Sequence, residues 1–241
     1  MPIYLDLFTY LFCVFITSYL LGSFNAAYLV ARFNNVDISN EGSGNPGTAN
    51  VLRVLGKKVA ILVLLVDVLK GFIAPYFWTF YLSSNCCFET SPLAWHVGIY
   101  MSAFAVIVGH CYPLYYKFRG GKGVASYVGF LLFLFSMPSH YENFYVYVHW
   151  EKVGPLWLVL LLVTYSIVLK LTKTSALASL SVVLSSIFIF YESSVMHSSY
   201  VEYSILQQNG GSILLLLIAL LIFWRHKPNF ERLIKGDDNK F

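Results

Sequence analysis

Charged residues are scarce in this 241-residue chain: Asp, Glu, Lys and Arg make up 12% of it, and hydrophobic residues make up 58%. An average soluble domain carries about 25% charged residues, so this chain has too few to coat a water-facing globule. Solid apolar runs such as 212–223 (SILLLLIALLIF) exclude the polar and apolar alternation of a transmembrane barrel. The composition therefore predicts an all-α polytopic membrane protein, with one integral-membrane domain over residues 1–241.

Several other features are missing. The chain has 4 cysteines, two of them inside apolar stretches, which predicts no disulfide framework. Residues 1–20 contain no Lys or Arg, so no cleavable signal is expected and the first span is retained. A formal net charge of +4 is too small to indicate a nucleic-acid partner. We expect no metal and no cofactor.

Apolar runs between polar breaks predict about seven transmembrane helices, with five or six as alternatives. They cover residues 4–31, 58–82, 93–116, 124–138, 155–171, 175–191 and 211–224. With seven spans, 14 of the 16 Lys and Arg fall on the side of the C-terminus, and only Lys152 falls in a loop on the other side. The positive-inside rule then places the N-terminus outside and the C-terminus in the cytoplasm.

The first loop on the basic side, residues 41–50 (EGSGNPGTAN), leads into Arg53. Its glycines cannot continue a helix, and backbone N–H groups beside Ser and Asn side chains form an anion nest. The Arg53 guanidinium adds a planar fork suited to phosphate. A flexible linker is the alternative. The candidate ligands in the loop are Gly42, Ser43, Gly44, Asn45, Gly47 and Asn50.

The second basic loop carries Gly120, Gly121, Lys122 and Gly123 directly before an apolar helix. Free N–H groups, a helix N-terminus and an ammonium at one point favour a phosphate. Because G-x-x-x-x-G-K-[ST] is absent, no nucleotide is implied. A basic turn that only obeys the positive-inside rule is the alternative, although it leaves the three glycines unexplained.

Two further features complete the pattern. After the last span, His226 and Asn229 lie one helical turn apart if that segment is helical. Within the second span, Asp67 and Lys70 are spaced i,i+3, and ionisable residues at membrane depth are usually paired or functional. We expect this pair to brace the site.

These motifs resemble the bacterial membrane glycerol-3-phosphate acyltransferase family that uses acyl phosphate as donor. The similarity covers nearly the whole chain. Its signatures are G-S-G-N with N-V-L-R (42–53), G-H-x-x-P with F-x-G-G-K-G-V-A (109–125), R-H-x-x-N-x-x-R-L-x-x-G (225–236) and D-x-x-K-G (67–71).

The resemblance implies that five residues hold glycerol 3-phosphate, namely Ser43, Arg53, Lys122, His226 and Asn229. It implies that the first loop, with Asn50, contacts the phosphate of the acyl donor. Asp67, Lys70, His110 and Asp238 would support the site. The chain departs from the family pattern at Asn25 (often Pro), Ala49 (usually Thr), Ser126 (Thr) and Asp238 (usually Glu).

The implied reaction transfers a fatty acyl group from acyl phosphate to the sn-1 hydroxyl of glycerol 3-phosphate, the first step of phospholipid synthesis. The implied partners are these two substrates, the lipid bilayer and a soluble acyl-phosphate synthase. The implied location is the bacterial inner membrane, with the active site on the cytoplasmic face. A membrane transporter or channel for a phosphorylated anion is the alternative, but such proteins usually carry polar residues deep in several spans.

Overall fold

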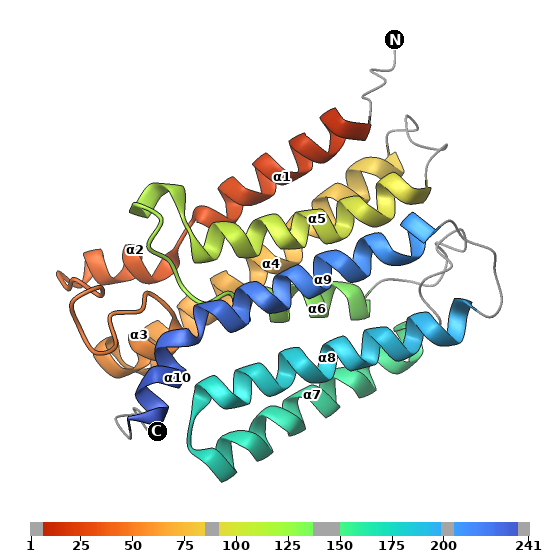
Figure 1. Ribbon diagram of the computed structural model, residues 1–241. Coiled ribbons are helices and arrows are strands. Elements are labelled where there is room, and N and C mark those ends of the chain that lie inside the picture. The colour runs from red at the N-terminus through yellow and green to blue at the C-terminus, as the bar shows by residue number, and fades with distance from the viewer. Residues whose placement is uncertain (1–6, 85–91, 137–149, 199–204, 236–241) are drawn as a thin grey trace.

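The computed structural model describes residues 7–84, 92–136, 150–198 and 205–235, which fold into helices joined by short loops (Figure 1). The predicted supporting residue Asp238 lies outside this part of the chain. The helices are α1 (Leu7–Ser23), α2 (Ala26–Phe33), α3 (Thr48–Leu55), α4 (Lys57–Ser84), α5 (Pro92–Cys111), the 3₁₀ turn η2 (Leu114–Tyr116), α6 (Val124–Ser136), α7 (Trp150–Thr172), α8 (Ser175–Ser198), α9 (Ile205–Arg225) and α10 (Lys227–Ile234).

The predicted spans fall on helices that lie side by side in a bundle, with the first span covering both α1 and α2 (Figure 1). Among the described residues, four segments are long and apolar enough to cross a membrane, or five if α9 and α10 count as one bent span. Helix α6 has 13 residues, which rise only about 20 Å against a hydrocarbon core of roughly 30 Å. The number of crossings and the orientation remain predictions.

The first predicted span, residues 4–31, corresponds to one candidate span over Leu7–Phe33, but its helix is broken, because α1 ends at Ser23 and α2 begins at Ala26. The buried Asn25 caps α2: its Oδ1 accepts hydrogen bonds from the N–H groups of Ala27 and Tyr28 at 3.0 and 3.3 Å. The hydropathy of this stretch is high on both sides of the break, so composition alone could not reveal it.

Glycines let two helix pairs approach to backbone contact. A Cβ on Gly22 of α1 would lie 2.2 Å from the carbonyl oxygen of Val106 in α5, and one on Gly71 of α4 would lie 1.9 Å from that of Ser126 in α6. No side chain fits at either crossing. The close contacts bring α1 against α5 and α4 against α6.

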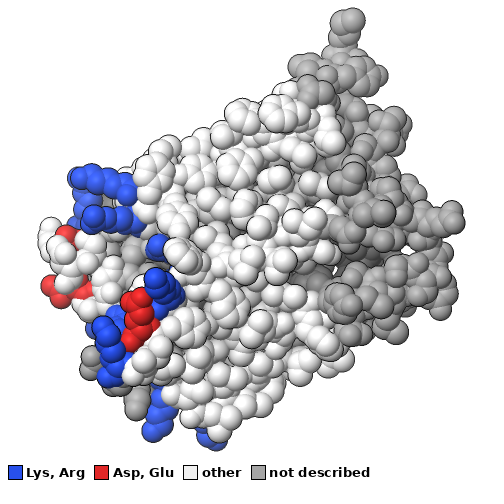
Figure 2. Space-filling view, viewed as in Figure 1, with Lys and Arg blue, Asp and Glu red and all other residues white. Residues whose placement is uncertain are grey.

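The core lies around α5, α6 and α9, and Phe130, Phe133 and Ile218 are fully buried in it. The α7–α8 hairpin packs beside α6 and α9, and α2, α3 and α10 gather at one end of the bundle (Figure 1). Figure 2 shows Lys and Arg concentrated at that end, while the described flank of the bundle is almost free of charge. The uncharged flank fits the hydrocarbon of a bilayer, and the basic end fits its aqueous face.

Candidate functional site

The Asn50 side chain forms hydrogen bonds with the backbone of the first loop. Its Oδ1 accepts a hydrogen bond from the Ser43 N–H at 2.7 Å, and its Nδ2 donates to the carbonyl oxygens of Glu41 and Ile38 at 2.9 and 3.3 Å. The side chain is 1% exposed. The amide groups of Asn50 therefore hold the loop backbone, and its implied contact with a donor phosphate stays a prediction.

Two glycines of this loop are required by its geometry. Gly42 and Gly44 have φ values of +59° and +68°, which L-residues with side chains rarely adopt. A Cβ on Gly42 would also lie 2.4 Å from Asn50 Oδ1. The loop is thus a fixed structure and not a flexible linker. Gly47 then precedes α3, whose fifth and sixth residues are Leu52 and Arg53.

The first loop is tied to the break between α1 and α2. Asn25 Nδ2 donates to the carbonyl oxygen of Pro46 at 3.3 Å, while Asn25 Oδ1 caps α2. Lys70 Nζ donates to the carbonyl oxygens of Gly22 and Phe24 at 3.1 and 2.9 Å, so it satisfies acceptors that the break leaves open.

Asp67, Lys70 and His110 form one buried cluster. Asp67 Oδ1 lies 2.8 Å from Lys70 Nζ and 3.3 Å from His110 Nδ1. All three residues are less than 5% exposed. The cluster connects the α1–α2 break to α5, and the expected Asp67–Lys70 pair exists with His110 as a third member.

The second loop rests directly on His110. The Gly121 N–H donates to the His110 carbonyl oxygen at 3.1 Å. A Cβ on Gly120 would lie 2.1 Å from that oxygen, and one on Gly121 would lie 2.2 Å from His110 Nε2. These two glycines are therefore needed for close packing. We expected a nest of free N–H groups in this loop. The nest is incomplete, because the Gly121 N–H already donates a hydrogen bond within the protein.

Arg225 clamps the same loop from the end of α9. Its Nε donates to the Gly121 carbonyl oxygen at 3.0 Å and its Nη2 to that of Gly120 at 2.7 Å. The guanidinium also lies 5.1 Å from the centroid of the Tyr112 ring. The loop is held between His110 and Arg225, and the next residue, Lys122, extends from this fixed base.

Lys122 Nζ donates a hydrogen bond to Asn229 Oδ1 in α10. Gly123 follows with a φ of +87° and begins the turn into α6. The segment after the last span is helical only from Lys227, and α10 is bent 43° from α9. This bend brings Asn229 over the second loop.

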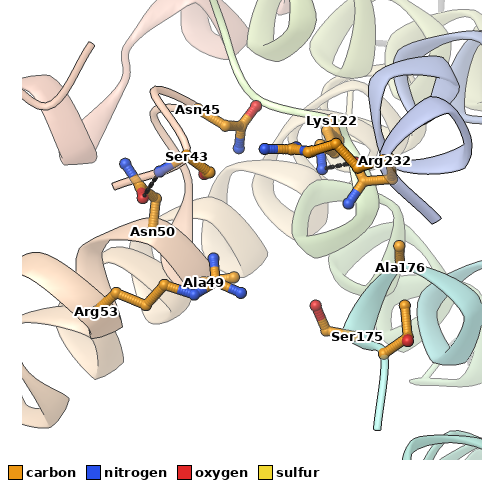
Figure 3. A pocket seen from close by; sticks show the side chains of 11 residues that line it. Ser43, Asn45, Ala49, Asn50, Arg53, Lys122, Ser175, Ala176 and Arg232 are labelled. Carbon is orange, nitrogen blue, oxygen red and sulfur yellow. Dashed lines mark hydrogen bonds between the residues drawn. The ribbon is translucent and has the colours of Figure 1, made fainter. Parts of the chain in front are cut away.

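Four of the five predicted ligands, Ser43, Arg53, Lys122 and Asn229, line one small polar cavity of about 30 Å³, which we call the polar pocket. Figure 3 shows Arg53 reaching toward it from α3, opposite Lys122 and Arg232. Among the described residues its lining includes three cations and neither Asp nor Glu. The remaining lining residues are Asn45, Ala49, Asn50, Thr174, Ser175 and Ala176. The charge of the pocket suits a phosphoanion.

His226 lies elsewhere. It is 2% exposed, and its Nδ1 is 2.7 Å from the Ile222 carbonyl oxygen. A carbonyl can only accept, so Nδ1 carries the proton in this contact. Burial lowers the pKa of His226 below its usual range, which favours a neutral ring. His226 lines the neighbouring groove and not the polar pocket, and of the other four predicted ligands only Lys122 also lines that groove.

The groove is a larger apolar cavity of about 590 Å³. Its walls come from α4, α6, α7 and α8, with Leu64, Leu131, Leu158, Leu161 and Val182 among them. It shares five lining residues with the polar pocket: Asn45, Ala49, Lys122, Ser175 and Ala176. A polar and an apolar chamber therefore meet at one boundary.

Some residues of the site escaped the sequence analysis. Arg232 lies one turn beyond Asn229 and within the same motif, so its spacing could have identified it. Ser175 and Ala176 begin α8 in a polar stretch without a distinctive motif. Arg225 begins the motif at 225–236, but its role could not be predicted, because its clamp joins residues more than 100 positions apart.

The apolar bundle with its basic end defines a multi-pass integral membrane protein. A family model described as glycerol-3-phosphate acyltransferase matches residues 12–236. The glycerol-3-phosphate acyltransferase of Pseudomonas paraeruginosa (strain DSM 24068 / PA7) is 37% identical over 227 residues, covering 94% of this chain and 97% of that protein. The one from Ruthia magnifica subsp. Calyptogena magnifica is 34% identical over 224 residues, covering 92% of each chain.

Solved structures agree with these relatives. The crystal structure of PlsY (YgiH), an integral membrane glycerol 3-phosphate acyltransferase, in its glycerol 3-phosphate form has a TM-score of 0.71 and 27% identity, over 96% of this chain and 95% of that one. Its lysophosphatidic acid form has a TM-score of 0.69 and 26% identity. The chain belongs to the glycerol-3-phosphate acyltransferase family.

Proposed function

We propose that this protein transfers a fatty acyl group from acyl phosphate to the sn-1 hydroxyl of glycerol 3-phosphate, giving 1-acyl-glycerol 3-phosphate and inorganic phosphate. The observation that carries the proposal is the shared boundary of two unlike chambers. The polar pocket carries Arg53, Lys122 and Arg232, and the apolar groove begins at its wall. A reaction that joins a phosphate ester to a fatty acyl chain needs such a junction.

The substrates fit the chambers by their chemistry. A phosphate dianion gains charge-assisted hydrogen bonds from the cations of the polar pocket. A fatty acyl chain gains by leaving water for the leucine-rich groove. The related PlsY structures are described as a glycerol 3-phosphate form and a lysophosphatidic acid form, which correspond to a substrate and the product of the proposed reaction.

In the proposed step, the sn-1 hydroxyl oxygen attacks the acyl carbon, the bond from that carbon to the phosphate oxygen breaks, and the hydroxyl proton leaves with the phosphate. Acyl phosphates are already activated, so positioning and charge stabilisation supply most of the catalysis. Arg53, Lys122 and Arg232 offset the repulsion between the two phosphoanions. Ser43 and Asn229 orient glycerol 3-phosphate from the first loop and α10.

His226 has a separate role in this proposal. With Nδ1 donating to Ile222, the neutral ring keeps a lone pair on Nε2. We assign this nitrogen to accept a hydrogen bond from a substrate hydroxyl at the groove boundary. In this arrangement His226 orients the nucleophile, while the cations bind the phosphates.

The proposed location follows from the charge distribution. Basic residues gather at the end where α2, α3 and α10 lie (Figure 2), and the positive-inside rule assigns that end to the cytoplasm. We therefore propose a bacterial inner-membrane enzyme whose site faces the cytoplasm, where a soluble synthase would deliver acyl phosphate.

The test gives the purified protein labelled glycerol 3-phosphate with either palmitoyl phosphate or palmitoyl-CoA and measures labelled lysophosphatidate. We expect product with palmitoyl phosphate and little with the thioester. Lys122→Met protein serves as the matched control with strongly reduced activity. Comparable turnover with palmitoyl-CoA would refute the donor assignment, and the absence of product with both donors would refute the acyltransferase proposal.

A further inference from the structure

A third cavity, of about 450 Å³, borders the polar pocket, and we call it the outer cavity. It shares Ser43, Asn45, Lys122 and Arg232 with the polar pocket. Asn45 and Lys122 line all three cavities. The polar pocket is thus reached from an apolar chamber on one side and from this polar chamber on the other.

The outer cavity is strongly basic. Among the described residues its lining includes five cations, Arg119, Lys122, Arg225, Lys227 and Arg232, and no carboxylate. Outside the lining, Glu231 Oε1 lies 3.9 Å from Lys227 Nζ. Both of these side chains are more than half exposed, so solvent screens the pair and it offsets little of the field.

Asp37, which precedes the lining residue Ser39 in the sequence, is held by other groups. It accepts hydrogen bonds from the Ser39 hydroxyl and N–H at 2.5 and 3.0 Å and from Asn40 Nδ2 at 2.8 Å. These bonds lower the pKa of Asp37, which stays ionised but neighbours the cavity without lining it. The cations therefore dominate the potential inside.

The two routes to the polar pocket suit different substrates. A phosphate dianion loses much solvation free energy in an apolar groove, so the route past Leu64 and Leu161 is closed to glycerol 3-phosphate. A cavity lined by charge of one sign focuses its field and raises the local concentration of the opposite ion. The outer cavity avoids the apolar groove and attracts anions, so it suits the entry of a small, water-soluble dianion.

We infer that the outer cavity is a vestibule that collects glycerol 3-phosphate from water and releases inorganic phosphate, with Arg119 and Lys227 as steering residues that do not contact the reacting atoms. This inference rests on the proposed function, because it assumes that glycerol 3-phosphate is the acceptor. It adds a binding region outside the polar pocket and assigns the two substrates to separate entrances.

The experiment compares wild type with the double variant Arg119→Gln/Lys227→Gln in a neutral detergent free of anionic lipid. The matched control is Lys57→Gln/Lys58→Gln, which removes the same charge from exposed residues at the start of α4 that line none of the three cavities. We expect kcat/KM for glycerol 3-phosphate to fall about three- to tenfold at low salt in the first variant. The kcat and the KM for acyl phosphate should change less than about twofold, and the difference should shrink as salt screens the field.

Each other outcome overturns the inference. An unchanged kcat/KM, or an equal loss in the control, would show that these cations do not steer substrate. A loss seen only in bilayers with phosphatidylglycerol would make the cavity a lipid-headgroup site. Wild-type protein that acylates no glycerol 3-phosphate would instead refute the proposed function, so the two failures are distinguishable.

A second test adds charge instead of removing it. Ser39 lines the outer cavity but neither of the other two, so Ser39→Cys can be modified with thiol reagents of similar size and opposite charge. We expect the anionic adduct to lower kcat/KM for glycerol 3-phosphate several-fold more than the cationic adduct does. Identical effects of the two adducts would contradict steering, and wild-type protein treated in the same way controls for native cysteines.

Discussion

Replacing Lys122 by methionine removes the ammonium that stands where all three cavities meet and keeps most of its aliphatic stem. The structure gives Lys122 a specific partner, because its Nζ donates to Asn229 Oδ1. Asn229 can therefore act in two ways: it can bind substrate itself, or it can hold Lys122 in position. A double-mutant cycle between the two residues separates these roles.

The expected magnitudes follow from the contacts. A hydrogen bond between a charged donor and a phosphate contributes about 1.5–3 kcal/mol, so Lys122→Met should lower kcat/KM for glycerol 3-phosphate about ten- to 150-fold. Asn229→Ala removes the positioning bond, worth about 0.5–1.5 kcal/mol, and should cost about two- to tenfold. If Asn229 acts mainly through Lys122, adding Asn229→Ala to Lys122→Met should cost less than about twofold more.

The assay is steady-state acyl transfer from palmitoyl phosphate at varied glycerol 3-phosphate, for wild type, both single variants and the double variant. Lys58→Gln is the control for loss of an exposed positive charge, and thermal melting shows whether each variant is folded. Multiplicative losses in the double variant would refute the positioning role of Asn229. Near-normal kcat/KM in folded Lys122→Met would refute the second loop as the phosphate site.

Three further predictions test the supports of the site and its orientation. Arg225→Lys keeps the charge but cannot reproduce the two bonds to Gly120 and Gly121; kinetics should show kcat/KM reduced about five- to twentyfold, and an unchanged value would contradict the clamp. Asn25→Asp keeps the acceptor that caps α2 but loses the donor to Pro46; titration with glycerol 3-phosphate should show a raised KM with α2 intact by circular dichroism, and a normal KM would separate Asn25 from the loop. Single cysteines at Ser43 and Ser193 should differ in labelling by an impermeant thiol reagent in intact cells, and equal labelling would refute the cytoplasmic placement of the first loop.

Hydropathy and charge predicted the longer helices and the basic end, because long apolar runs have few alternatives to helix in a bilayer. They missed the break at Phe24–Asn25, since its cost is met by partners distant in sequence. Lys70 and Asn25 satisfy the open carbonyl and N–H groups there. A single sequence does not show that such partners will meet.

The candidate site likewise has a part that the sequence predicted and a part that it did not. Residue type predicted Ser43, Arg53 and Lys122, the family resemblance added Asn229, and the structure brings the four to one pocket. Residue type could not tell which way a side chain turns. Asn50 turns into its own loop, and His226 lines the groove and not the polar pocket.

Glycine is required in these loops for two different reasons, positive φ and close packing. Together they explain how the cations are positioned. At Gly42, Gly44 and Gly123 the backbone has positive φ, so glycine is needed for the turn itself. At Gly120 and Gly121 the space a Cβ would fill is occupied by His110, so glycine is needed for contact with a neighbouring helix. The second loop thereby rests on the Asp67–Lys70–His110 cluster, which also supports the α1–α2 break. Because that break is tied through Asn25 to Pro46 of the first loop, one buried cluster in the spans fixes the separation of Arg53 and Lys122, the cations that face each other across the polar pocket.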